Sequence, residues 1–159
     1  MTTEYRVIFD KFIKKLKGDN SFFDYKDLSE EEINEIVHEH LLSLLNRSID
    51  KIYSFGSPDI DFYDKDDENQ VFNAVLIPQE ISLLSELMYF LYLEEDKNKL
   101  KSLGIFFRTS EINVFSPANE RKSYLDMIDK EESRILNLLS NYLSRDRETW
   151  TFKSVYGGN

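Results

Sequence analysis

Apolar side chains recur at three- and four-residue steps in four long stretches of this chain, which is the spacing of amphipathic helices. The second stretch has the clearest limits. Ser29 and Glu32 form a capping-box pattern at its start, and Gly56 and Pro58 follow its last apolar residue. Helices are therefore expected over about residues 3–17, 30–55, 78–97 and 117–144.

Between these stretches the chain is less regular. Residues 59–70 read as an acidic loop, residues 71–77 as a short strand or extended piece, and residues 105–115 as either a strand or an irregular segment. We expect a mainly α fold, a bundle of about four helices with one irregular or short β segment and an extended C-terminal tail. In this prediction residues 1–145 form the helical domain and residues 146–159 form the tail.

Charge and composition narrow the possible partners. The chain has 30 acidic and 20 basic side chains and a formal net charge of −10, so DNA phosphates repel it and a broad nucleic-acid-binding surface is not expected. Cysteine is absent, which excludes disulfides and Cys-based zinc sites. The longest apolar-rich stretch, residues 81–93, is interrupted by Ser82, Ser85 and Glu86 and is shorter than the roughly 20 residues of a membrane span. No membrane partner is expected.

The patterns that carry catalysis or metal binding are weak. The acidic loop offers oxygen ligands, but Asp64 or Asp66 stands where an EF-hand loop needs glycine. His38 and His40 are two residues apart on a helix, so they point to different faces and do not chelate one metal together. The sequence has no phosphate-binding glycine loop and no nucleophile elbow. We therefore expect no enzyme activity, no cofactor and no metal.

The C-terminal tail is the candidate binding segment. Trp150, Phe152 and Tyr156 are spaced in twos, as on one face of a strand, and Val155 lies in the same segment. A strand of this kind can add to the sheet edge of a partner, where main-chain bonds give affinity and alternate side chains give specificity. We predict that these four residues bind a partner and that removing residues 146–159 leaves the fold intact but weakens assembly. The alternative is that the tail folds back onto its own domain.

A longer pattern runs from the third helix to the start of the fourth. It consists of N-x-x-L-x-x-x-E-I, followed by a Leu/Met-rich helix, and then S-x-A-N before the last helix. In this pattern the chain resembles head–tail connector proteins of phages of Gram-positive bacteria. The matching hydrophobic and capping positions are Asp24, Tyr25, Phe72, Leu76, Glu80, Ile81, Leu84, Met88, Phe115, Ser116, Ala118 and Asn119.

The resemblance implies a virion structural protein of the neck between capsid and tail, made in the host cytoplasm. Such adaptors form a homo-oligomeric ring, usually dodecameric, below the portal protein. They extend the DNA channel, through which DNA passes without sequence-specific binding, and dock the stopper or tail-completion protein. An acidic surface is compatible with such a passage. The alternative from a different class is a small helical regulator that binds a single host or phage protein.

Overall fold

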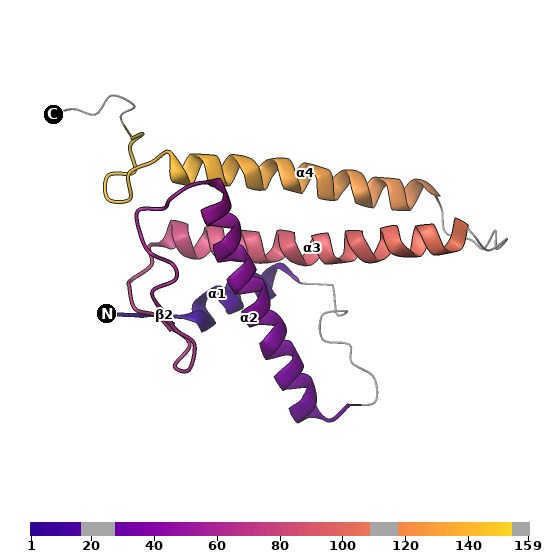
Figure 1. The fold of residues 1–159 in the computed structure, drawn as a ribbon, viewed down its shortest axis with the longest axis horizontal. Helices are drawn as coiled ribbons and strands as arrows, with labels where there is room; N and C mark the ends of the chain where they lie inside the picture. The colour runs from indigo at the N-terminus through magenta and orange to yellow at the C-terminus, as the bar shows by residue number, and fades with distance from the viewer. Residues whose placement is uncertain (17–27, 109–117, 154–159) are drawn as a thin grey trace.

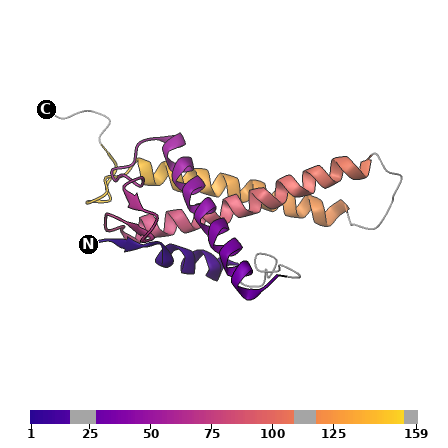
Figure 2. The same cartoon turned by 60° about the horizontal axis from the view of Figure 1, so that its bottom comes forward.

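The computed structural model describes the backbone of residues 1–16, 28–108 and 118–153, and the side chains of these residues outside 99–121. α3 and α4 lie side by side as a long hairpin, α2 crosses it, and α1 lies against the first half of α3 (Figures 1 and 2). The mainly helical fold predicted from the sequence is confirmed. The helices of the described part are α1 (Tyr5–Lys15), α2 (Glu30–Phe55), α3 (Pro78–Arg108) and α4 (Ala118–Leu143).

The start of α2 follows directly from the local sequence. The Ser29 hydroxyl accepts a hydrogen bond from the backbone N–H of Glu32, and the Glu32 carboxylate accepts one from the backbone N–H of Ser29. This is the predicted capping box, which satisfies backbone donors that the first turn leaves unpaired. At the other end, the backbone N–H of Gly56 bonds to the carbonyl of Ile52. Both predicted ends of α2 are confirmed.

A small antiparallel sheet lies beside the starts of α1 and α3. Its order is β1–β3–β2, with β1 at Thr3–Glu4, β2 at Lys65–Asp66 and β3 at Val71–Phe72. Phe72 pairs with Thr3 on one side and with Lys65 on the other. An extended piece at residues 71–77 was predicted, but the helical assignment of Thr3 and the loop assignment of Lys65–Asp66 were wrong. These short strands exist because of pairing between distant segments, which local periodicity does not report.

The third helix is longer than predicted. The charged residues 94–97 were expected to end it, yet α3 continues to Arg108 and passes through Gly104. Charged side chains favour helix as well as they favour loops. Two of them are used in packing: Glu95 bonds to His40 and Arg47 of α2, and Lys97 bonds to Asp129 of α4 at 2.5 Å. These contacts between helices explain why α3 does not stop there.

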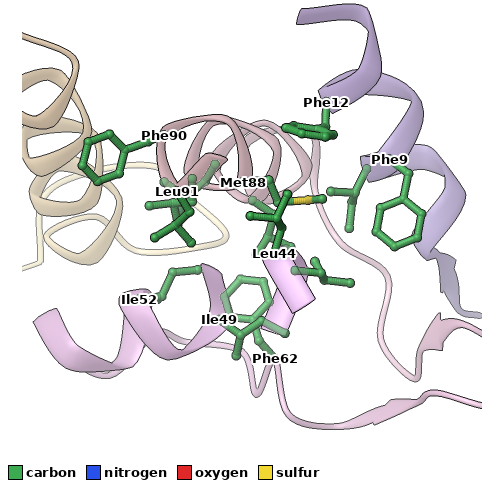
Figure 3. Close-up of a cluster of buried hydrophobic side chains, with 14 of the residues drawn as sticks. Phe9, Phe12, Leu44, Ile49, Ile52, Phe62, Met88, Phe90 and Leu91 are labelled. Carbon is green, nitrogen blue, oxygen red and sulfur yellow. The ribbon is translucent and has the colours of Figure 1, made fainter. Parts of the chain in front are cut away.

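The hydrophobic core lies where α1, α2 and the first half of α3 meet (Figure 3). Phe12 of α1 meets Tyr92 of α3 edge to face, with ring centroids 6.3 Å apart and an interplanar angle of 82°. Phe62, from the loop between α2 and β2, is fully buried in the same core. Full burial of one such side chain contributes about 1.5–3 kcal/mol to folding. The labelled side chains in Figure 3 are Phe9, Phe12, Leu44, Ile49, Ile52, Phe62, Met88, Phe90 and Leu91.

The bonds between α2 and Glu95 make part of the stability pH-dependent. Burial raises the pKa of Glu95, but the bonds from His40 and Arg47 outweigh burial and hold its pKa below the usual 4.5. Because the folded-state pKa is the lower one, this contribution is present above pH 4.5 and is lost as the pH falls through the folded pKa.

Glu95→Gln is expected to lower the free energy of unfolding at neutral pH by about 1 kcal/mol. It should also reduce the further loss of stability on acidification below pH 4.5. Urea unfolding at a series of pH values measures both effects. Glu94→Gln is the matched control, because among the described residues Glu94 forms no hydrogen bond or ion pair. Equal pH profiles for the two variants would contradict the assignment.

Candidate functional site

The N-terminus of α3 carries a fully buried carboxylate. Glu80 occupies the third position of α3, after Pro78 at the first. Its Oε2 accepts a hydrogen bond of 2.8 Å from the backbone N–H of Ile77, which caps the helix, and its Oε1 accepts one of 3.2 Å from the Tyr142 hydroxyl of α4. Burial, followed by the charge of Glu80, raises the pKa of Tyr142, so this hydroxyl stays protonated as the donor. The carboxylate thus links the start of α3 to the end of α4.

Arg147, just past α4, supplies the charge that compensates Glu80. Its Nε donates to Glu80 Oε1 at 2.6 Å, and one terminal nitrogen donates to Glu80 Oε2 at 3.1 Å and to the Val75 carbonyl at 2.6 Å. A forked pair of this kind fixes direction as well as distance. The Glu80 hydrogen bond raises the pKa of Arg147. The first part of the tail is therefore bound to the domain through an ion pair whose carboxylate is fully buried and whose guanidinium is 26% exposed.

Residues 144–153 form a closed hairpin around this anchor. Arg145 and Phe152 form an antiparallel bridge, and backbone bonds of 2.8 Å join Asp146 N–H to Thr151 C=O and Lys153 N–H to Ser144 C=O. The Asp146 carboxylate accepts bonds from the backbone N–H and the hydroxyl of Thr149, which lower its pKa. This segment folds back onto its own domain, the alternative that the sequence left open.

Two of the four predicted partner-binding residues lie in the hairpin. Trp150 is half-buried against Tyr142, with ring centroids 6.4 Å apart, and has a positive φ of 58°. Phe152 is 66% exposed, and its ring centroid is 4.3 Å from the Arg145 guanidinium. Val155 and Tyr156 lie outside the described residues. Of the two described residues, Phe152 presents its ring to solvent, whereas Trp150 packs against the domain.

Sequence reasoning missed Arg147 and Asp59, which attach the hairpin to the domain. Asp59 Oδ2 accepts a bond of 3.1 Å from the Arg147 backbone N–H, and Asp59 Oδ1 pairs with Lys153 Nζ at 2.7 Å. Because the chain has 30 acidic and 20 basic side chains, the sequence does not show which acidic residues pair with a basic one. The one available signal was Glu80, the acidic residue in the first turn of α3, just before its Leu-rich stretch.

Several carboxylates of the acidic loop accept hydrogen bonds from other groups of the domain. Asp61 bonds to the Tyr53 hydroxyl and the Tyr63 backbone, and Asp66 bonds to the Asn69 side chain and backbone. These bonds to Asn69 lower the pKa of Asp66. In the part of the chain that the structure describes, no group of three or more His, Asp or Glu side chains is placed to hold a metal ion.

The two histidines have separate partners, as their spacing implied. The His38 ring lies 3.1 Å from the Gln70 amide nitrogen, and the His40 ring lies 2.9 Å from Glu95. Both contacts join α2 to other elements of the domain, so each histidine has a packing role.

Comparison with protein-family models, with curated proteins and with solved structures finds no match to this chain. In the described ranges, none of the helices combines the length and the apolar character that crossing a membrane needs.

Proposed function

We propose that this protein is a head–tail connector, a virion structural protein that forms a ring below the portal, extends the DNA channel and docks the stopper or tail. The observation that carries the proposal is the place of the residues behind the resemblance. Phe72, Leu76, Glu80, Leu84 and Met88 are all buried. These five matching positions lie in the core, which supports a resemblance in the packing of the domain.

The shape of the helical hairpin suits a ring subunit. α3 has 31 residues, which corresponds to a length of about 46 Å. Its second half and the beginning of α4 extend beyond α1 and α2 (Figure 1). A projecting hairpin offers a long flank along which neighbouring copies can pack side by side. Closed rings repeat one such contact between two different surfaces of the subunit.

The C-terminal hairpin supplies a second surface. Because Arg147 is held by Glu80, the hairpin has a defined place on the domain and presents the exposed ring of Phe152. We assign Phe152, together with Val155 and Tyr156, to contact with the portal or with a neighbouring subunit. An adaptor needs such a second contact surface, whereas a regulator with one partner needs only one.

The function is tested by mixing the protein with portal complexes from the same phage or prophage and imaging the mixture by cryo-EM. The expected result is a ring of this protein stacked on the narrow end of the portal, with the tail located at a subunit or portal contact. Absence of any association, with the protein folded and the tail intact, would contradict the adaptor proposal. The regulator with one protein partner would then replace it.

The exposed hairpin ring gives a matched pair of variants for the same assay. Phe152→Ala is expected to weaken portal association at least tenfold while leaving the unfolding free energy within about 0.5 kcal/mol of wild type, because the ring is exposed. Tyr63→Ala, which removes another half-exposed ring, should leave association unchanged. Equal association of the two variants would exclude Phe152 from the contact.

A further inference from the structure

An open groove of about 570 Å³ lies between α1 and the start of α3. Its apolar lining is Val7, Pro78 and Ile81, and its charged lining is Asp10, Lys11 and Lys14. Val7 is 46% exposed, and Lys14 is also exposed. Among the described residues Lys14 forms no ion pair, and Asp10 faces Arg6 at 3.8 Å. Lys11 also donates a hydrogen bond to the Ser82 hydroxyl of α3. With two lysines and one aspartate, the α1–α3 groove is weakly basic on a chain of net charge −10, and part of its lining is apolar.

The first turns of α2 have the opposite character. This segment, residues 30–39 and here called the α2 tip, projects beyond the other elements (Figure 1). Its glutamates are all exposed, Ile33 and Ile36 are half-buried, and full burial begins only at Leu41. The α2 tip is thus an acidic amphipathic helix end with incompletely covered apolar side chains.

The glutamates of the α2 tip repel one another and destabilise the helix in the isolated protein. Glu31, Glu35 and Glu39 follow one another at four-residue steps, and like charges at this spacing destabilise a helix by about 0.2–0.5 kcal/mol per pair. Among the described residues none of the three forms an ion pair that would offset the repulsion. A basic partner along this stripe would relieve it.

The two surfaces also match in spacing. Lys11 and Lys14 are three residues apart on α1, and Glu31 and Glu35 are four residues apart on α2. Both steps place side chains about 5–6 Å apart on a helix surface. Two helices that lie against each other can therefore pair both lysines with both glutamates. Ile33 and Ile36 lie on nearly the opposite side of α2 from Glu31 and Glu35 and stay outside this contact.

We propose that the α2 tip of one copy of this chain docks in the α1–α3 groove of the next copy. This contact joins two different surfaces, so its repetition generates a ring or a chain of subunits. A second copy is the occupant because the chain itself carries both complementary surfaces, and neither finds its counter-charge within the described residues. The inference rests on the proposed connector function and names the contact that would build its ring.

Charge reversal with mixing tests the contact. Lys14→Glu and Glu35→Lys are each expected to weaken self-association at least tenfold in sedimentation velocity at low ionic strength, since each opposes like charges. An equimolar mixture of the two variants should regain wild-type association, because every contact between unlike copies is again complementary. Lys130→Glu and Glu68→Lys, which reverse exposed charges outside both surfaces, are the matched controls and should associate like wild type. Failure of the mixture to recover would overturn the proposal.

Cross-linking tests the same contact independently of its strength. The chain has no cysteine, so Val7→Cys and Asn34→Cys introduce unique thiols on the groove and on the tip. With a short bismaleimide, the double variant is expected to give a ladder of covalent oligomers, alone or on the portal, while each single variant stops at dimers. A double variant that also stops at dimers in both settings would overturn the contact.

The two proposals can fail separately. A ring on the portal built from other surfaces, without the ladder, would overturn this contact and leave the connector function standing. A ladder without portal association would retain the contact and overturn the connector function.

Discussion

Arg147→Met is expected to lower the free energy of unfolding by about 3 kcal/mol, although Arg147 lies outside the four helices. The substitution keeps most of the side-chain length but leaves the Glu80 carboxylate, which is fully buried, without its compensating charge. Breaking one side of a buried ion pair costs more than the pair itself contributes, because the remaining charge has lost both water and partner. Urea unfolding followed by far-ultraviolet circular dichroism measures the loss.

Lys153→Met is the matched control for this prediction. Lys153 pairs with Asp59 at 2.7 Å in the same hairpin, but both side chains are about one-third exposed. Exposed pairs contribute roughly 0–1 kcal/mol, so this variant should stay close to wild type. A loss from Arg147→Met no larger than that from Lys153→Met would mean that Glu80 is compensated in some other way.

A second substitution separates the charge from the packing. In Glu80→Gln/Arg147→Met the amide oxygen can accept the bond from Ile77 N–H, and the amide NH2 can donate to the Tyr142 hydroxyl oxygen, so that no buried charge remains unpaired. The double variant is expected to be more stable than Arg147→Met alone, because an unpaired neutral group costs less to bury than an unpaired charge. A double variant less stable than the single one would contradict the electrostatic explanation.

The same contact changes where the tail begins. The sequence suggested that residues 146–159 could be removed without loss of fold. Such a truncation also removes Arg147, so the buried Glu80 carboxylate is left without its compensating charge. We therefore expect a chain ending at Lys153 to unfold like the full chain and a chain ending at Arg145 to be destabilised about as much as Arg147→Met. An assembly defect can be assigned to the missing tail residues only in the chain that ends at Lys153, because that chain keeps its stability.

Features encoded by near neighbours in sequence were predictable. Ser29 and Glu32 set the start of α2 through contacts three residues apart, and helical spacing identified the core sides of α1, α2 and α4. The continuation of α3 past residue 97 was not predictable, because it depends on Glu95 and Lys97 meeting residues of two other helices. A run of charged residues has the same local sequence pattern whether it ends a helix or bonds that helix to its neighbours.

In the candidate site, too, local spacing could not indicate the features that depend on residues distant in sequence. Trp150 and Phe152 both lie against the Arg145 guanidinium, but the positive φ of Trp150 departs from the strand conformation that their two-residue spacing implied. The spacing did not indicate that Trp150 packs on Tyr142 or that Arg147 pairs with Glu80, because both partners are distant in sequence. Which tail residues belong to the domain is a tertiary property.

Phe62→Ala is expected to lower the free energy of unfolding by about 3–5 kcal/mol, even though the residue lies in the segment that the sequence assigned to an acidic, solvated loop. Phe62 is fully buried, and its ring contacts Phe72 of β3 and Tyr142 of α4 at centroid distances of 6.3 and 6.4 Å. Its removal would leave a cavity between the sheet, the core and the hairpin anchor. Such a cavity adds its own cost to the lost burial.

Tyr63→Ala is the control, because it removes a neighbouring ring of similar size that is 50% exposed. The Tyr63 hydroxyl bonds to Asp50, and the ring stacks on Tyr53 at 4.6 Å, so a loss of about 1 kcal/mol is expected. Phe62→Leu, which keeps much of the volume, should recover most of the stability lost by Phe62→Ala. Equal losses for Phe62→Ala and Tyr63→Ala would contradict the role of the Phe62 ring in the core. The expected difference would show that Phe62, next to the partly buried Ile60, anchors this acidic segment in the core.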